Sequence, residues 1–238
     1  MFKDFKIKIF ADGADLKSVE NLNKEEFIKG FTTNPSLMKK AGITDYKSFS
    51  IDLIKLIGKK PISLEVFTDD IEEMEKQAKE ISSWGDNVFV KIPITNTKGE
   101  TTVGLVKKLL DFGIKCNVTA VFTLKQVKQI YENTNNKTNL IISIFSGRIA
   151  DTGRNPIKTI EESIKMCESK KNIEILWAST RELYNIVEAE KCNCHIVTVP
   201  YEILNKFKNI GKDLDLMSID TVKSFYKDAL SAGFKIKT

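Results

Sequence analysis

The sequence predicts an α/β protein folded as a single TIM (β/α)₈ barrel, for three reasons. Short runs of apolar or β-branched residues recur along the chain, beginning near Ile7, Lys29, Ile62, Asn87, Cys116, Asn139, Ile173 and His195. Successive runs are roughly 22–34 residues apart, which is the length of a strand, a helix and two short loops. The chain has 238 residues, a length typical of one such barrel.

Helical spacing of apolar residues fills the gaps between these runs. One predicted helix follows the cap residues Asp69 and Asp70, and its apolar face carries Ile71, Met74, Ala78 and Ile81. A second follows Pro156 and carries Ile157, Ile160 and Ile164. A last, amphipathic helix is predicted between a Ser218 cap and Gly233, with Val222, Phe225, Tyr226 and Leu230 on its apolar face.

Strand and helix patterns alternate from one end of the chain to the other, which predicts a parallel sheet. No linker, repeat or composition break divides the chain, so we expect one catalytic domain over residues 1–238 that includes the C-terminal amphipathic helix. The alternative is a doubly wound open sheet. It is disfavoured because no glycine-rich fingerprint follows the first predicted strand.

The composition excludes several classes of partner. Hydrophobic residues make up 42% and charged residues 29%, with a net charge of +5, which is ordinary for a globular protein. The lysines are spread along the chain without a basic stripe and interleaved aromatics, so no nucleic-acid partner is expected. Residues 1–6 lack a signal-peptide pattern and no apolar run could span a bilayer, which predicts a cytoplasmic protein with no membrane partner.

The cysteines predict free thiols in a reducing compartment, because they are too few for a disulfide scaffold: Cys116, Cys167, Cys192 and Cys194. Cys192, Cys194 and His195 could suggest a metal site. Their spacing is not that of a zinc site, and His195 is the only histidine. The segment is better explained as the start of a strand, and no metal is expected.

Lys91 is the strongest candidate for chemistry. It lies within the apolar run of residues 88–94, VFVKIPI. Desolvation there disfavours the ammonium ion, and a neutral amine is the form that attacks a carbonyl to give an imine. The alternative is a lysine at a strand edge that forms a salt bridge or extends its ammonium group to water.

Two carboxylates belong to predicted strands: Asp12 ends the first, and Glu65 lies within the third, in residues 62–67, ISLEVF. In such a barrel the active site lies at the carboxyl ends of the strands. A buried carboxylate needs a partner, and Lys91 could be one. One carboxylate could handle the water lost and gained at an imine, and the other a substrate hydroxyl. Asp12 could instead cap a helix or belong to a turn, because Gly13 follows it.

The later predicted strands carry polar residues, and arginines follow two of them. Residues that could orient sugar hydroxyls or line a site share strand faces: Asn117, Thr119, Ser143 and Phe145. Arg148 and Arg181 follow the sixth and seventh strands, and a guanidinium group matches phosphate oxygens. Barrels often bind phosphate near their last strands. Each arginine could also be an ordinary surface residue, and this is the favoured explanation for Arg154.

An ordered set of motifs resembles the transaldolase family over nearly the whole chain. Residues 30–37, GFTTNPSL, resemble the family signature at the second strand, and residues 90–95, VKIPIT, resemble its Schiff-base lysine segment. Its later strand ends are similar to residues 117–119, 143–149 and 178–181. The closing segments 221–226 and 232–234 are also similar to the family, and together the motifs are highly specific.

The resemblance implies a role for each matched residue. Lys91 forms an imine with a ketose donor, and Asp12 carries the proton of the hydroxyl next to the bond that breaks. Glu65 serves imine formation and hydrolysis through a water, helped by Thr119. The dihydroxyacetone part is held by Asn34, Asn117 and Ser143, with Thr33 close by in the substrate site. The phosphate is bound by Arg148, Ser179 and Arg181.

The implied reaction transfers a dihydroxyacetone unit from fructose 6-phosphate or sedoheptulose 7-phosphate to an aldose phosphate, with no metal or organic cofactor. Related fructose-6-phosphate aldolases release dihydroxyacetone and have Gln and Tyr where this chain has Glu65 and Phe145, so these residues favour the transferase. A catalytically silent sugar-phosphate-binding barrel is a third hypothesis. The short length resembles small transaldolases that form ring-like oligomers, so a homo-oligomer is expected.

Three residues depart from the family pattern. Gly13 replaces a usual Thr or Ser, Ile144 a usual Pro, and Thr180 a usual aromatic residue. These departures bear on donor preference and phosphate fit more than on imine chemistry.

Overall fold

The computed structural model describes residues 5–236. Its strands form one closed, parallel barrel in sequence order. They are β1 (Lys8–Asp12), β2 (Ile28–Thr32), β3 (Ile62–Glu65), β4 (Val88–Pro93), β5 (Cys116–Val121), β6 (Leu140–Ile144), β7 (Ile173–Trp177) and β8 (Ile196–Pro200). The predicted barrel is confirmed, and each strand begins within one residue of its predicted start. Residues 1–4 of the N-terminal segment and residues 237–238 of the predicted domain lie outside the described residues.

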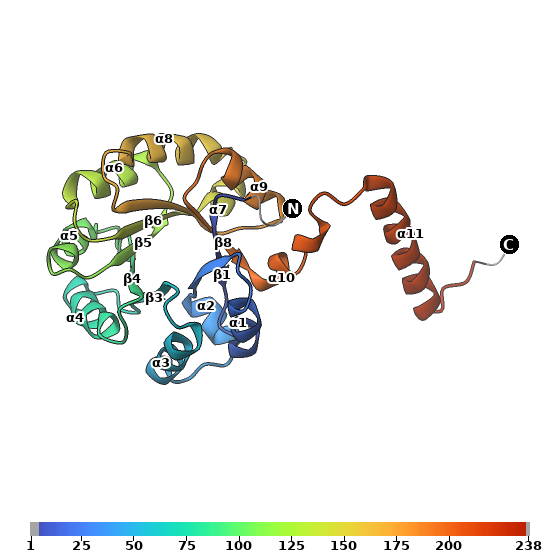
Figure 1. Cartoon of the computed structure of the whole chain (residues 1–238), viewed down its shortest axis with the longest axis horizontal. Helices are drawn as coiled ribbons and strands as arrows, with labels where there is room; N and C mark the ends of the chain where they lie inside the picture. Colours follow the sequence, from blue (N-terminus) through green and yellow to red (C-terminus); the bar gives the residue numbers. More distant parts are fainter. Residues whose placement is uncertain (1–4, 237–238) are drawn as a thin grey trace.

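Helices surround the barrel, as Figure 1 shows. They are α1 (Leu16–Asn23), α2 (Pro35–Lys40), α3 (Tyr46–Ile57), α4 (Ile71–Ser82), α5 (Val103–Asp111), α6 (Leu124–Asn133), α7 (Ser146–Ala150), α8 (Ile157–Cys167) and α9 (Tyr184–Lys191). After β8 the chain continues through α10 (Tyr201–Leu204), the 3₁₀ helix η2 (Phe207–Asn209) and α11 (Leu214–Ser231).

The predicted helix starts are confirmed for α4 and α8 and wrong for α11. Asp70 caps α4 by accepting a hydrogen bond from the Glu73 backbone N–H at 2.9 Å, and α8 begins directly after Pro156. The cap of α11 is Asp213, whose carboxylate accepts from the Leu216 N–H at 3.0 Å. Ser218 therefore lies inside the helix, because an earlier side chain already satisfies the free N–H groups of the first turn.

The barrel interior is apolar near the amino ends of the strands and polar near their carboxyl ends. Its buried apolar cluster consists of Phe10, Phe89, Ile141, Leu176, Ala178 and Ile196. Side chains two positions apart on a strand share a face, so Phe10 is followed by Asp12, and Phe89 by Lys91. A side chain at Gly30 would collide with the Phe10 ring, with its Cβ 2.6 Å from Cζ. The polar side chains at the carboxyl ends of the strands thus lie directly next to this buried apolar cluster.

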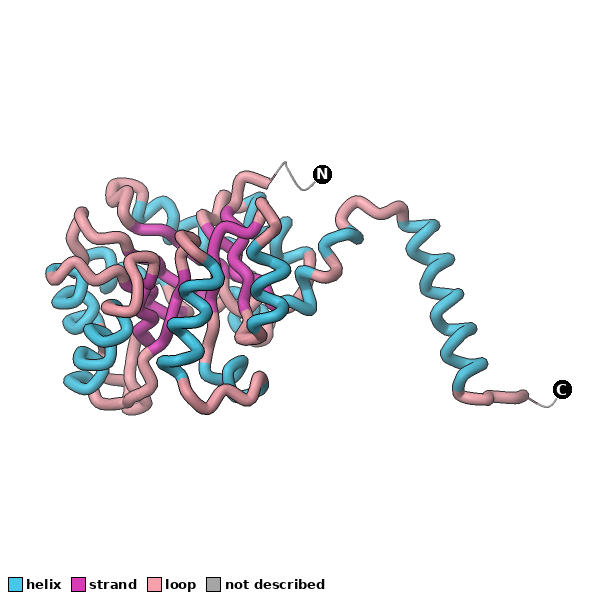
Figure 2. The backbone as a smooth tube through the Cα atoms, turned by 60° about the horizontal axis from the view of Figure 1, so that its bottom comes forward, coloured by secondary structure: helices cyan, strands magenta, loops and turns pink. Residues whose placement is uncertain are grey.

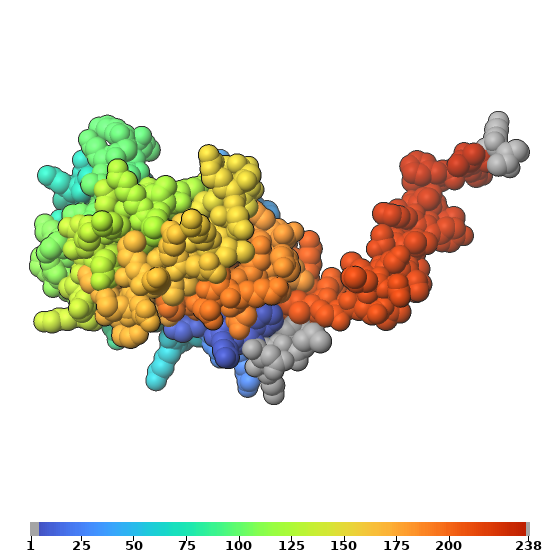
Figure 3. Space-filling model, turned by 90° about the horizontal axis from the view of Figure 1, so that it is seen from above, coloured from blue at the N-terminus to red at the C-terminus, as the bar shows by residue number. Residues whose placement is uncertain are grey.

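Helix α11 lies apart from the barrel in Figures 2 and 3. None of its residues is buried, and its exposed large apolar side chains are Leu214, Leu216, Met217, Ile219, Val222, Phe225, Tyr226 and Leu230. Within residues 5–236, no helix has both the length and the apolar character needed to cross a membrane.

Candidate active site

A cavity of about 430 Å³ opens at the carboxyl ends of the strands. Its lining includes the predicted site residues Asp12, Asn34, Glu65, Lys91, Thr119, Ser143, Phe145, Arg148, Ser179 and Arg181. The other two predicted residues, Thr33 and Asn117, are fully buried and touch residues of the lining. A larger depression of about 820 Å³ lies beside the amino ends of β7 and β8 and contains none of the predicted residues.

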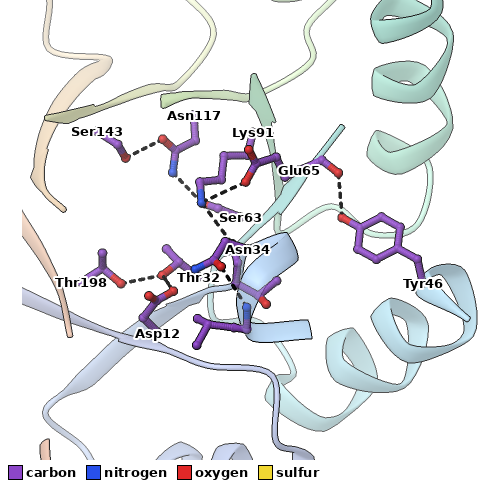
Figure 4. Close-up of polar contacts among 12 residues, drawn as sticks. Asp12, Thr32, Asn34, Tyr46, Ser63, Glu65, Lys91, Asn117, Ser143 and Thr198 are labelled. Carbon is purple, nitrogen blue, oxygen red and sulfur yellow. Dashed lines mark hydrogen bonds and ion pairs between the residues drawn. The ribbon is translucent and has the colours of Figure 1, made fainter. Parts of the chain in front are cut away.

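Lys91 and Glu65 face each other on adjacent strands, β4 and β3, at paired positions. The Lys91 Nζ lies 3.3 Å from Glu65 Oε2 (Figure 4). It also donates a hydrogen bond to the Thr33 carbonyl oxygen at 3.1 Å. Only 9% of the Lys91 side chain is exposed. The salt bridge of the alternative explanation is present, but the lysine does not extend into bulk solvent.

Tyr46 fixes the end of β3 from outside the barrel. Its hydroxyl donates to the Glu65 carbonyl oxygen at 3.0 Å (Figure 4). Burial raises the pKa of Tyr46, so the hydroxyl keeps the proton that it donates. The backbone that carries the Glu65 carboxylate is therefore held in place independently of Lys91.

Asp12 is held at the end of β1 by a hydrogen bond from Thr32. The Thr32 hydroxyl donates to Asp12 Oδ1 at 2.7 Å. Burial raises the pKa of Asp12, whereas the Lys91 ammonium group and this hydrogen bond oppose the rise. The helix-cap explanation is wrong, because Asp15 caps α1 by accepting from the Ser18 N–H at 2.8 Å.

Thr198 extends this contact into a chain of two hydrogen bonds that ends on Asp12. Its role is not predicted in the sequence analysis. The Thr32 and Thr198 hydroxyl oxygens are 2.5 Å apart (Figure 4). A hydroxyl has one proton to donate, and Thr32 gives its proton to Asp12. Thr198 is therefore the donor to Thr32 while Asp12 is ionised. The period-two alignment of strand ends could have indicated Thr198, which lies two residues after the inward-facing Ile196.

Thr32→Val is expected to raise the pKa of Asp12, because it removes a hydrogen bond that favours the carboxylate. If ionised Asp12 is the base, activity falls as pH decreases through its pKa. The acid limb of the pH profile of kcat/KM should therefore move to higher pH. The control is Ser163→Ala, which removes a buried hydroxyl bonded to the Thr159 carbonyl in α8. An unmoved acid limb in Thr32→Val would contradict this coupling.

Ser143, Asn117 and Ser63 form a hydrogen-bonded chain across the barrel (Figure 4). Ser143 donates to Asn117 Oδ1 at 2.7 Å, and Asn117 Nδ2 donates to Ser63 Oγ at 2.9 Å. The Ser143 proton is thereby used, and its oxygen is left to accept from a ligand hydroxyl. Asn117 acts on the cavity through Ser143, since it does not line the cavity itself. Ser63 was not singled out from the sequence.

Asn34 and Thr119 both line the cavity. A helix cap constrains the backbone at Asn34, and an irregularity in β5 constrains it next to Thr119. Asn34 caps α2, because its Oδ1 accepts from the Leu37 N–H at 3.0 Å, so its Nδ2 remains for a ligand. Thr119 precedes Ala120, which has a positive φ of 55°. The β5–β6 register shifts at this point, a feature of β-bulges that re-aim side chains beside sites. The Thr119 hydroxyl is buried without a hydrogen-bond partner within the described chain.

The two arginines approach the cavity from helix α7 and from the neighbouring loop after β7. Arg148 in α7 is exposed, and its guanidinium carbon lies 5.5 Å from the centre of the Phe145 ring. Ser179, in the loop after β7, has φ of 63°, a conformation uncommon for a residue with a side chain. A Cβ at Gly147 would lie 1.7 Å from the Ser179 carbonyl oxygen. Glycine therefore lets this loop lie against α7 and brings Arg181 to the same side as Arg148.

The three departures from the family pattern occupy different environments. Thr180 is buried and donates to the Thr198 carbonyl oxygen at 2.7 Å, which ties the β7 loop to β8. Ile144 packs in the main hydrophobic core. Gly13 has open space where a side chain would begin. Of the three, Thr180 alone lines the cavity.

The predicted free thiols are confirmed. Cys116, Cys167, Cys192 and Cys194 are unpaired and buried, and burial raises the pKa of Cys167 and of Cys192 to about 11. Throughout residues 5–236, no three or more His, Cys, Asp or Glu side chains form a group that could hold a metal ion.

The fold and the cavity define a (β/α)₈ barrel with a lysine-centred site, flanked by two carboxylates and two arginines. The chain belongs to the transaldolase/fructose-6-phosphate aldolase family, whose model matches residues 9–237.

Individual relatives agree with this assignment. The chain is 33% identical over 204 residues to a probable transaldolase of Methanococcus vannielii, covering 85% of this chain and 90% of the relative. It is 32% identical over 232 residues to a probable transaldolase of Thermoanaerobacter sp., covering 97% and 100%.

Solved structures show the same fold at low sequence identity. A putative dihydrodipicolinate synthase family protein from Coccidioides immitis has a TM-score of 0.60 at 10% identity, covering 96% of this chain and 78% of that protein. A putative lyase/mutase from Burkholderia cenocepacia has a TM-score of 0.60 at 12% identity, covering 87% and 84%.

Proposed function

We propose that this protein is a transaldolase that moves a dihydroxyacetone unit from a ketose phosphate to an aldose phosphate through a Schiff base on Lys91. The observation that carries the proposal is the buried Lys91 amine, 3.3 Å from the Glu65 carboxylate, inside the cavity. The family assignment and the relatives named as probable transaldolases support it.

The first stage forms the imine. Glu65 accepts a proton from Lys91, and the neutral amine adds to the ketose carbonyl. The resulting carbinolamine loses water, and Glu65, with a water held by Thr119, supplies and removes the protons. Thr119 suits this role because its buried hydroxyl lines the cavity. The product is a protonated imine, which can accept the electron pair of a neighbouring carbon–carbon bond.

The second stage breaks that bond. Asp12 removes the proton of the hydroxyl on the carbon beyond the breaking bond, and the electron pair moves into the iminium ion to give a neutral enamine. An aldose phosphate leaves. The reverse sequence joins the enamine to a second aldose phosphate, and Asp12 returns its proton. Hydrolysis then frees Lys91 and the new ketose phosphate.

The arginines suit the phosphate of both aldoses. Arg148 and Arg181 line the same side of the cavity as Ser179, and a guanidinium group offers paired donors to phosphate oxygens. Fructose 6-phosphate and sedoheptulose 7-phosphate differ in chain length between the reacting carbon and the phosphate. Exposure of both arginines at the mouth allows their side chains to follow either length.

Transfer is favoured over release of free dihydroxyacetone. Phe145 packs near Phe122 with ring centres 5.7 Å apart and presents no hydroxyl to orient a hydrolytic water. Protonation of the enamine carbon and hydrolysis of the resulting iminium ion are therefore slow, and an acceptor aldehyde can react with the enamine first.

The test is the release of glyceraldehyde 3-phosphate from fructose 6-phosphate, with and without erythrose 4-phosphate. Release that requires erythrose 4-phosphate supports the transaldolase. Release at the same rate without it would make the protein an aldolase. If no donor among fructose 6-phosphate and sedoheptulose 7-phosphate is turned over while both bind, the silent sugar-phosphate-binding barrel replaces the proposal.

We also propose a homo-oligomer in which α11 packs on a neighbouring copy. None of the residues of α11 is buried in the single chain. Its apolar side chains Val222, Phe225 and Tyr226 are each more than 60% exposed. Several large apolar side chains exposed along one helix are typical of a protein interface. We expect the partner to be a second copy of this chain, because identical subunits can each pack their C-terminal helix on a neighbour in a symmetric assembly.

Val222→Asp is expected to dissociate the oligomer, because it places a charge in the apolar face of α11. Light scattering after size-exclusion chromatography would show a shift from a multiple of the chain mass toward one chain. Ser224→Asp adds the same charge on the opposite face of the helix and should leave the mass unchanged. A wild-type protein of one-chain mass would contradict the proposed assembly.

A further inference from the structure

We propose that Asp151 determines how strongly the site favours phosphorylated substrates, by competing with the substrate phosphate for Arg181. The inference rests on the proposed function, in which Arg181 binds phosphate. Asp151 Oδ2 lies 2.5 Å from a terminal nitrogen of the Arg181 guanidinium group. No role for Asp151 follows from the motifs or from the lining of the cavity.

The short helix α7 and the loop after β7 bring the three charged groups together. Arg148 and Asp151 are three residues apart at α7, which places their side chains near one another. Arg181 crosses the first turn of the same helix, since a Cβ at Gly147 would lie 2.9 Å from its Cγ. The Arg181 backbone N–H also donates to Asn185 Oδ1 at 2.9 Å. The stem of Arg181 is thus fixed, and its terminal group can turn between Asp151 and the cavity.

The contact to Asp151 uses one terminal nitrogen of Arg181. A phosphate in the cavity that binds through this nitrogen has to break the ion pair with Asp151. The Asp151 carboxylate also lowers the positive potential at the cavity mouth. Two arginines and one aspartate give a local charge of +1, whereas a phosphate monoester carries a charge of roughly −1.5 to −2 at neutral pH. Removal of the carboxylate would leave +2.

The competition has a consequence for turnover. In the proposed reaction one aldose phosphate leaves the subsite before the next one enters. A counter-ion that replaces the departing phosphate on Arg181 assists this exchange, because release steps often limit turnover. About half of each side chain is exposed, 51% for Arg181 and 52% for Asp151, so solvent screens the effect. A change of about two- to five-fold is expected, which is the range of an exposed charge pair.

The test compares Asp151→Asn with the wild-type enzyme. The inhibition constant of inorganic phosphate and the KM for erythrose 4-phosphate should both fall about two- to five-fold. The KM for non-phosphorylated glyceraldehyde as acceptor should not change. Asp111→Asn is the matched control, because Asp111 forms an exposed ion pair with Lys107 at 2.8 Å in α5. It should alter none of these constants.

Calorimetric titration with inorganic phosphate separates this proposal from the proposed function. Tighter phosphate binding to Asp151→Asn supports the competition even if no transaldolase turnover is found. Unchanged or weaker phosphate binding in Asp151→Asn would overturn it, since Asp151 would then merely orient Arg181. Arg181→Ala identifies the site: it should weaken phosphate binding, and in its background Asp151→Asn should have no further effect.

Discussion

Lys91→Ala is expected to abolish turnover, lowering kcat/KM by about 10⁴-fold or more, because no imine can form without the amine. Substrate phosphate contacts are distant from this change, so binding of the donor should persist. The measurement is the rate of aldose phosphate transfer, together with equilibrium binding of fructose 6-phosphate. Residual activity within about ten-fold of wild type would mean that another nucleophile operates.

Two further variants separate chemistry from folding. Removing Lys91 leaves the Glu65 carboxylate, 18% exposed, without its ion partner, and an unpaired buried charge is destabilising. Lys91→Met keeps much of the side-chain volume, and with Glu65→Gln it removes both charges. This double variant should stay folded by circular dichroism and remain inactive. Lys107→Ala, on the surface of α5, is the control and should retain full activity.

Asp12→Asn is expected to spare imine formation and to slow carbon–carbon bond cleavage by about 10²–10⁴-fold, the usual contribution of a positioned acid or base. Single-turnover kinetics would show a normal trapped imine with delayed release of glyceraldehyde 3-phosphate. Asp15→Asn is the matched control, because Asp15 is three residues away, caps α1 and is exposed. If Asp12→Asn blocks the imine itself, the division of roles between Asp12 and Glu65 is wrong.

The same variant has a predicted effect on stability. Burial raises the pKa of Asp12 above that of the unfolded chain, so the folded state holds the proton more tightly. Ionisation of this carboxylate lowers the free energy of unfolding. The loss begins as pH rises above the pKa in the unfolded chain and is complete above the raised pKa of the folded state. At neutral pH, Asp12→Asn should therefore not lower Tm. At a pH below the pKa of Asp12 in both the folded and the unfolded state, the Tm values of wild type and Asp12→Asn should differ less, as thermal unfolding would show.

Much of the fold could be predicted because its signals are local and periodic. The β-branched runs mark strands, and their regular spacing marks the βα repeat. The position of Lys91 beside Glu65 follows from the parallel register of β3 and β4, which places the carboxyl ends of both strands on one face. Candidate chemistry at strand ends was therefore accessible from the residues, with the family resemblance adding the individual roles.

Long-range contacts could not be predicted in the same way. Thr198 reaches Thr32 because β8 closes the barrel against β1, across 166 residues of chain. Asp151 meets Arg181 because Gly147 admits the loop after β7, and no motif near Asp151 indicates this contact. The cap of α11 was misplaced because Asp213 and Ser218 are both good capping residues, and the local pattern does not distinguish them.

The most direct test of the central claim is to reduce the enzyme with borohydride during turnover of fructose 6-phosphate and to map the modified peptide by mass spectrometry. The account predicts a reduced three-carbon adduct on Lys91 and on no other lysine, and none when Lys91→Met is treated in the same way. An adduct on a different lysine, or turnover with no adduct at all, would contradict it.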